Sequence, residues 1–185
     1  SIISPEKIVA EYKAKGWENV ICYGMGSSLD DVKNAAAAEM NIVCSAAAIK
    51  AAEYLKEKFG TPYEIEYPQS CLPEEIVQKA YNFTDKNVLV IQNQTAADAV
   101  RKLITEKSGK CHCTSATFFM QKKELLQQSD FFLADERDLC DNVGDNYDVV
   151  IADKTLRRVM KNFSGEFIDF PHFGLSGRLL QGESE

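Results

Sequence analysis

The stretch "NVLVIQNQTAADAVRKLITEK", residues 87–107, decides the fold class. Its first part, 87–92, is a continuous apolar run of strand length, which is typical of a central parallel strand that is buried on both faces. Its second part, 95–107, is an amphipathic helix whose apolar side chains recur every three or four residues: Ala96, Ala99, Val100, Leu103 and Ile104. A buried strand followed by an amphipathic helix is the unit from which parallel α/β sheets are built.

The same alternation of helix and strand extends in both directions along the chain. Before residue 87 we expect a helix from Pro5, a helix capped by Ser28, a helix ended by Gly60, and strands at 18–24, 41–45 and 63–67. After residue 107 we expect helices around 121–128 and 155–163, and strands around 111–119, 130–135, 147–153 and 166–171. The pattern predicts an α/β fold with parallel, doubly wound sheets. The proline-containing segment 68–75 marks the expected boundary between a first lobe, 1–70, and a second lobe, 71–185.

Composition and charge exclude several classes of protein. The 185 residues are 45% hydrophobic and 26% charged, which is ordinary for a globular protein. A net charge of −7 disfavours nucleic acid and anionic membrane surfaces as partners. No apolar run approaches the roughly 20 residues of a membrane span, and the N-terminal sequence is not typical of a signal peptide. We therefore expect a cytoplasmic protein whose six cysteines are free thiols.

The segment "YGMGSS" (23–28) lies between an expected strand and an expected helix. Ligands of parallel sheets bind beyond the carboxyl ends of the strands, and backbone N–H groups at such a turn can hold an anion. Gly26, Ser27 and Ser28 are therefore candidate anion- or cofactor-binding residues. Leu29 stands where a G-x-G-x-x-G motif needs its third glycine, so the alternative is a plain tight turn.

Cys44 and His172 also follow strands. Cys44 ends the strand at 41–45, beside the start of a helix, a location that lowers the pKa of a thiol and favours the thiolate that binds metal. The alternative is a small buried side chain. His172 lies in the loop "FPHFGLSGR" (170–178) after the last strand, and the alternative is a solvent-facing loop histidine.

The segment "KCHCTSATFF" (110–119), which holds a histidine between two cysteines, is interpreted as packing. Cys111 and Cys113 point to one face of a strand and His112 to the other, so the three cannot bind one ion. The chain has no C-x-x-C pair, P-loop or H-E-x-x-H motif and no Ser-His-Asp order. Nothing in these motifs indicates hydrolysis or phosphoryl transfer.

Taken in order, the segments resemble the component 1 family of nitrogenases, which includes the molybdenum–iron protein chains, their cofactor-assembly scaffolds and the protochlorophyllide and chlorophyllide reductases. The family pattern is a Leu-Asn-Leu-Val strand, a helix, and Glu-x-Phe/Tyr-Gly-Ile-Pro before another strand. Here the matching residues are Met-Asn-Ile-Val at 40–43 and Glu-Lys-Phe-Gly-Thr-Pro-Tyr at 57–63. Segments 86–107 and 147–178 are similar to later parts of the family pattern. The resemblance spans nearly the whole chain.

This resemblance implies Rossmann-like three-layer lobes with mostly parallel sheets, and a metallocluster or a tetrapyrrole-like ligand between the lobes. In the catalytic nitrogenase chain, a cysteine just after the Asn-Leu-Val strand and a histidine in the late loop hold the iron–molybdenum cofactor. With a one-residue gap these positions match Cys44 and His172, which become the expected metal ligands of an iron–sulfur-based cluster. The expected partners are another component 1 type chain, in a homo- or hetero-oligomer, and an iron-protein reductase.

Two departures from the family shape the functional prediction. Ala46, Ala47 and Ala48 stand where the family has a basic residue, and the chain lacks the N-terminal domain whose cysteines hold the electron-entry cluster. We therefore expect a fragment or truncated member of these oxidoreductases that is inactive on its own. The alternatives are a metal-free α/β ligand- or anion-binding module and a non-catalytic interaction or assembly subunit.

Overall fold

The larger lobe is built on a five-stranded parallel sheet. The structure is a computed structural model that describes residues 4–143 and 146–176. The strand order is β5-β4-β3-β6-β7, formed by β3 (Asn87–Ile91), β4 (His112–Thr117), β5 (Phe131–Phe132), β6 (Val149–Ala152) and β7 (Glu166–Asp169). At the centre, Val90 pairs with Ser115 of β4 and with Ile151 of β6. The continuous apolar run at 87–92 is thus the central strand, as its sequence predicts.

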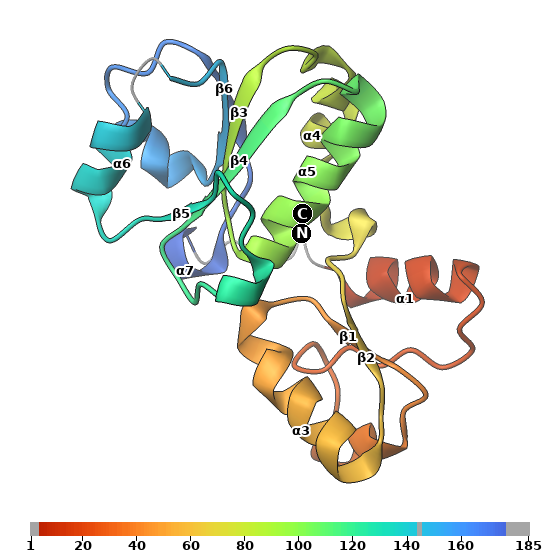
Figure 1. Cartoon of the computed structure of the whole chain (residues 1–185). Coiled ribbons are helices and arrows are strands. Elements are labelled where there is room, and N and C mark those ends of the chain that lie inside the picture. The colour runs from red at the N-terminus through yellow and green to blue at the C-terminus, as the bar shows by residue number, and fades with distance from the viewer. Residues whose placement is uncertain (1–3, 144–145, 177–185) are drawn as a thin grey trace, which may run out of the picture.

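Helices cover both faces of this sheet, which makes the lobe a three-layer α/β structure (Figure 1). On one face α4 (Glu74–Lys79) and α5 (Gln94–Ser108) pack over Val88 and Val90. On the other, α6 (Glu136–Val143) and the 3-10 helix η6 (Lys154–Arg158) pack over Leu89 and Ile91. Alternate side chains of one strand thus enter two separate cores. The predicted Rossmann-like, mostly parallel fold class is confirmed.

The smaller lobe is a β–α–β unit. β1 (Asn41–Val43) and β2 (Tyr63–Ile65) pair in parallel, and α3 (Ile49–Phe59) connects them, preceded by the short helix α2 (Leu29–Lys33). α3 ends at Gly60, whose φ of 77° lies in the left-handed region that glycine tolerates. The core of the smaller lobe consists of four buried side chains: Val43, Ala46, Ile49 and Ala52.

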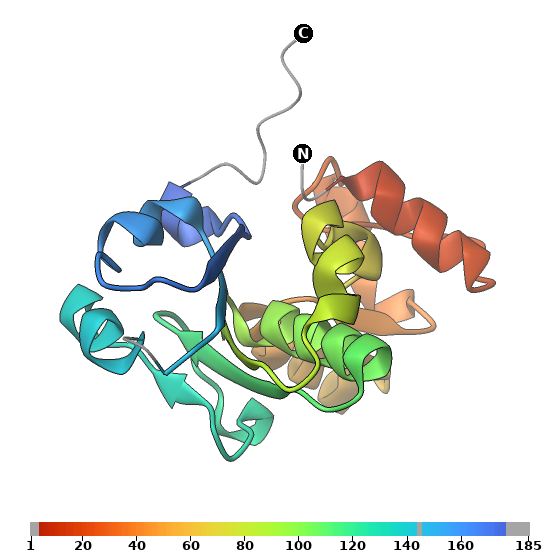
Figure 2. The ribbon, with the colours of Figure 1, turned by 90° about the horizontal axis from the view of Figure 1, so that it is seen from above.

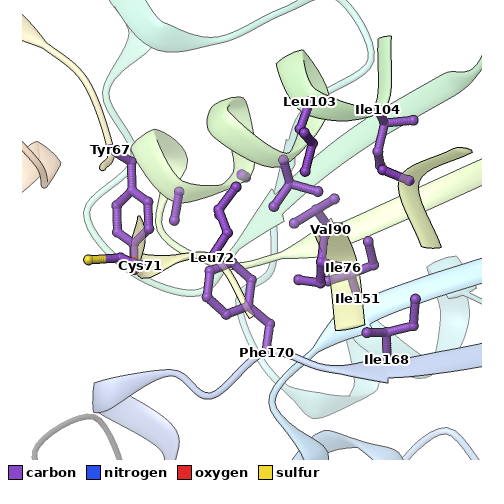
Figure 3. Packing of buried hydrophobic residues seen from close by; sticks show 14 of the residues in the cluster. Tyr67, Cys71, Leu72, Ile76, Val90, Leu103, Ile104, Ile151, Ile168 and Phe170 are labelled. Atoms are coloured by element: carbon purple, nitrogen blue, oxygen red, sulfur yellow. The ribbon is translucent and has the colours of Figure 1, made fainter. Parts of the chain in front are cut away.

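The segment between the lobes is buried rather than solvated. Tyr67, Cys71 and Leu72 join the core that also holds Ile76 of α4 (Figure 3). The Tyr67 ring meets Phe170 edge to face, with 6.4 Å between ring centroids. The N-terminal helix α1 (Pro5–Ala14) adds its own side chains Ile8 and Tyr12 to the same core. Figure 2 shows α4 and α5 between the sheet and these N-terminal segments. The domain division at 70/71 stays a prediction.

Several elements differ from the sequence-based expectation. The strand expected at 18–24 does not form, because these residues pair with no strand among the described residues. Their side chains do alternate, since Val20 and Cys22 face the core while Ile21 and Tyr23 are exposed. The expected helix at 121–128 is the single 3-10 turn η5 (Lys123–Leu125).

The other differences lie after residue 130. The expected helix at 155–163 is reduced to η6, while Leu156, Met160 and Phe163 still reach the core. The helix α6 was not expected, because Leu139 and Val143 are its only buried residues. A one-turn helix, α7 (Phe173–Ser176), follows the last strand. No helix in the described part of the chain is long and apolar enough to cross a membrane.

Candidate functional site at the carboxyl edge of the sheet

A network of hydrogen bonds joins the carboxyl ends of β3 and β7. The buried Gln92 side chain donates from Nε2 to the carbonyl oxygens of Phe170 (3.4 Å) and Pro171 (3.1 Å). Its Oε1 accepts the backbone N–H of Asn93 at 3.0 Å. Asn93 in turn caps α5, because its side chain accepts the N–H of Ala96. These hydrogen bonds therefore connect the loop after β7 to the start of α5.

A buried carboxylate at the end of β6 fixes the same loop. Asp153 has no exposed surface. Its Oδ2 accepts the backbone N–H of His172 at 2.8 Å, and its Oδ1 accepts the N–H and hydroxyl of Thr155 at 2.9 and 2.8 Å. The carboxylate therefore holds the backbone of His172 against the sheet edge.

His172 presents its ring to an aromatic neighbour. The imidazole stacks on Phe119, with 5.3 Å between centroids and 21° between planes. Its Nδ1 accepts the N–H of Gly174 at 3.0 Å, so Nδ1 carries no proton in this arrangement. Burial lowers the pKa of His172 from 6.5, and the nearby Asp153 opposes this shift. The surroundings therefore favour the neutral imidazole more than solvent does. Residues 177 and 178 of the predicted loop lie outside the described residues.

The residues that follow Phe119 and His172 along the chain are apolar and exposed. Phe119, Met120 and Phe173 are 43, 66 and 61% exposed. We call these three residues and His172 the edge aromatic surface. Met120 has a φ of 47°, a left-handed conformation that non-glycine residues seldom adopt and that clusters at functional sites. Phe119 and His172 also line a small space beside the stack, together with Ile91 and Leu175, and this space has no room for a water molecule. A ligand would therefore lie against the exposed side of the stack and not in this space.

Cys44 reaches the same edge of the molecule through its backbone. The Thr95 hydroxyl, in the first turn of α5, lies 2.5 Å from the carbonyl oxygen of Cys44 and 2.7 Å from Oδ1 of Asn93. Hydrogen-bonding groups thus connect Cys44, through Asn93 and Gln92, to the loop that carries His172. Cys44 is not among the residues that line the space beside His172, so a shared site for the pair stays a prediction.

The surroundings of the Cys44 thiol contradict the expected low pKa. Burial raises its pKa to about 12, and the neighbouring Cys71, Cys22, Glu66 and Glu11 add to the rise. The cost of burying a thiolate beside carboxylates therefore exceeds any stabilisation from the adjacent helix start. Within residues 4–143 and 146–176, no group of three or more His, Cys, Asp or Glu side chains is arranged to hold a metal ion.

The predicted anion site at Gly26, Ser27 and Ser28 lies in a turn closed by its own side chains. Ser27 Oγ accepts the N–H of Gly24 at 3.2 Å. The backbone N–H and the hydroxyl of Ser28 both donate to the Asp31 carboxylate, at 2.7 and 2.8 Å. An external anion would have to displace Asp31, so anion binding here stays a prediction that this capping box disfavours.

Two further observations concern single residues. Cys111 and Cys113 pack against the larger core, as their sequence predicts, while His112 is exposed. Sequence reasoning missed Phe119 and Asp153. The position of Asp153 directly after the buried run "VVIA" was a signal that could have found it. Nothing in the sequence marked Phe119, because its partner His172 is distant along the chain.

Comparisons with known proteins show the fold. No family model matches the chain, and no curated protein is significantly similar to it in sequence. The structure "Nitrogenase Cp1 at pH 6.5" matches with a TM-score of 0.53 and 14% identity, over 90% of this chain and 45% of that one. Glutamate racemase from Aquifex pyrophilus is 16% identical over 89% of this chain and 61% of its own, but its TM-score of 0.35 carries no argument. The chain is thus similar in fold to a nitrogenase chain of which it spans less than half the length.

Proposed function

We propose that the chain is a ligand-binding α/β module of the nitrogenase component 1 type, which holds a planar, tetrapyrrole-like ligand at the carboxyl edge of its sheet, beside the smaller lobe. The observation that carries this proposal is the stack of Phe119 on His172 within the edge aromatic surface. Each aromatic contact with a planar ligand contributes about 0.5–1.5 kcal/mol beyond the burial of apolar area. In a complete oxidoreductase of this type, an iron-protein reductase would supply electrons to the bound ligand.

The test is binding of zinc protoporphyrin IX, followed by its absorption and fluorescence. Phe119→Ala removes the stacking partner of His172, and we expect it to weaken binding by about tenfold, which corresponds to about 1.4 kcal/mol. The matched control is Phe59→Ala, because Phe59 is 59% exposed at the end of α3 in the other lobe. Equal loss of affinity in both variants would show that the porphyrin adsorbs to apolar surface without using this site.

An iron–sulfur-based cluster fits the residues present less well. A thiol with a pKa of about 12 is protonated at neutral pH, whereas a cluster requires the thiolate. Nδ1 of His172 also already accepts a hydrogen bond. The pairing of Cys44 and His172 around a metal is therefore a second, separate proposal. It requires that anaerobic reconstitution with iron and sulfide loads iron stoichiometrically, and that both Cys44→Ser and His172→Ala lose it. Iron content that is indifferent to both changes would end this proposal.

An exposed apolar surface on the smaller lobe supports a further proposal, namely that this lobe binds another component 1 type chain. Four apolar side chains in one short segment are exposed: Ile21 (49%), Tyr23 (41%), Leu29 (81%) and Val32 (51%). Exposed apolar side chains that gather on one part of a surface are typical of a face that another protein covers. Sedimentation of the chain should reveal an oligomer that the double change Leu29→Lys and Val32→Lys dissociates. A monomer at all concentrations would contradict self-association.

A further inference from the structure

A cavity lies away from the carboxyl edge, against the first half of β4. Its volume is about 330 Å³, within the range of sites for small molecules. Its wall is formed by the later part of α5, by the start of β4 and by the loop before β5. Polar side chains dominate this wall, among them Thr105, Thr114, Gln127 and Ser129. Cys111, His112 and Cys113 of the segment "KCHCTSATFF" also line the cavity, whereas none of the residues of the edge aromatic surface does.

A buried guanidinium supplies the charge of this cavity. Arg101 is 8% exposed. Among the described residues that line the cavity, it is the one that belongs to the charged types Lys, Arg, Asp and Glu. Nε donates to the carbonyl oxygen of Cys113 at 3.1 Å, Nη1 donates to Asp98 at 2.7 Å, and Nη2 donates to Asp130. A guanidinium has five N–H groups, so each terminal nitrogen retains a second donor beyond these bonds.

The two carboxylates that contact Arg101 are not equivalent. Asp130 has 5% side-chain exposure and also accepts the backbone N–H groups of Ser115 (2.9 Å) and Gln127 (3.0 Å), so it is a fixed structural partner. Asp98 has 34% side-chain exposure. Burial and Asp130 raise the pKa of Asp98, against the opposing effect of Arg101. Asp98 is therefore the carboxylate that an incoming ligand can most easily displace from Nη1.

We propose that this cavity binds a small monocarboxylate, which replaces Asp98 on Nη1 of Arg101 and binds the N–H groups that Asp130 does not use, while hydroxyl and amide groups of the wall meet the rest of the molecule. The planar guanidinium matches a carboxylate in bidentate geometry. A monocarboxylate that replaces Asp98 on Arg101 keeps the number of negative charges on the guanidinium at two, whereas phosphate adds a further one and is bound more weakly. This site is independent of the function proposed for the carboxyl edge.

The experiment is a titration of the full ¹⁵N-labelled chain with butyrate, monitored by NMR. The expected result is a saturable shift of the Arg101 Nε–H signal and of the backbone amides of Thr114 and Ser129. Butyramide has the same shape without the charge, and inorganic phosphate carries excess charge, so both should bind more weakly. Shifts that do not saturate, that lie elsewhere, or that are equal for butyrate and butyramide would overturn the proposal.

Variants assign the binding to the cavity. Ser129→Trp places a large ring in the cavity from its exposed rim and should weaken butyrate binding by more than about tenfold. Gln128→Trp is the matched control, because Gln128 is exposed, adjacent and not part of the wall. Arg101→Lys keeps the charge but loses the fork, and should also weaken binding. Undiminished binding by Ser129→Trp would overturn the proposal even if Arg101→Lys fails to fold.

Discussion

At the scale of single residues, His172 links stability to pH. Its pKa is lowered from 6.5 by burial, so the unfolded chain takes up a proton at a higher pH than the folded chain does. The contribution of His172 to the free energy of unfolding is therefore fully present above pH 6.5. It falls as the pH drops below that value toward the lower pKa of the folded state. We expect wild-type protein to lose more stability between pH 7.5 and pH 5.5 than His172→Gln, measured by urea unfolding.

The chain contains its own control for this prediction. His112, the other histidine, is exposed on β4, so His112→Gln should keep the wild-type pH dependence. A pH dependence that disappears in His112→Gln, or survives unchanged in His172→Gln, would show that the imidazole of His172 is not the group responsible.

Cysteine reactivity tests the environment of Cys44. With a pKa of about 12, about one in ten thousand Cys44 thiols is ionised at pH 8, whereas Cys140 is exposed. Iodoacetamide at pH 8 should therefore alkylate Cys140 well before Cys44, and mass spectrometry of the peptides measures both. Alkylation of Cys44 as fast as Cys140 would mean that the thiolate is stabilised, which would strengthen the case for metal binding at Cys44.

At the scale of elements, the start of α5 holds the two lobes and the site together. The Asn93 side chain accepts the N–H of Ala96 at 3.1 Å and also contacts the Thr95 hydroxyl, which meets Cys44 of the other lobe. Asn93→Ala should cost about 0.5–2 kcal/mol of unfolding free energy, as loss of a helix cap does. Asn82→Ala, at an exposed position, is the control in the same denaturant experiment. Equal stability of the two variants would contradict a capping role.

The elements that sequence predicts best are those whose own side chains supply the signal. The run at 87–92 and the apolar stripe of α5 each carry a complete pattern, and both appear where expected. Residues 18–24 carry a strand pattern but no local information about a partner strand, and none of the described strands pairs with them. α6 buries only Leu139 and Val143, which is too weak a periodic signal to predict a helix.

At the scale of the whole molecule, the two lobes differ in the size of their cores. The core of the smaller lobe is four side chains over a two-stranded sheet, whereas the larger lobe has a core on each face of a five-stranded sheet. Two paired strands without further support are marginally stable. Amides of β1 should therefore exchange with solvent through openings at least about 2 kcal/mol less costly than those of β3.

Native-state hydrogen exchange of the full chain measures this difference. Ile42 and Val43 report on the smaller lobe, and Val88, Leu89 and Val90 report on the larger one. If both sets of amides exchange through one common opening, the buried segment around Tyr67 and Phe170 couples the lobes into a single cooperative unit.

The sequence by itself determined the α/β class, the central strand and helix, and the packing of Cys111 and Cys113. These depend on periodicity and on turn residues, which are properties of neighbours along the chain. Only the tertiary structure decided the protonation of Cys44, the stack of Phe119 on His172 and the place of Asp153 beneath that loop. Burial, stacking and hydrogen bonding between distant segments set these features, so no local pattern encodes them.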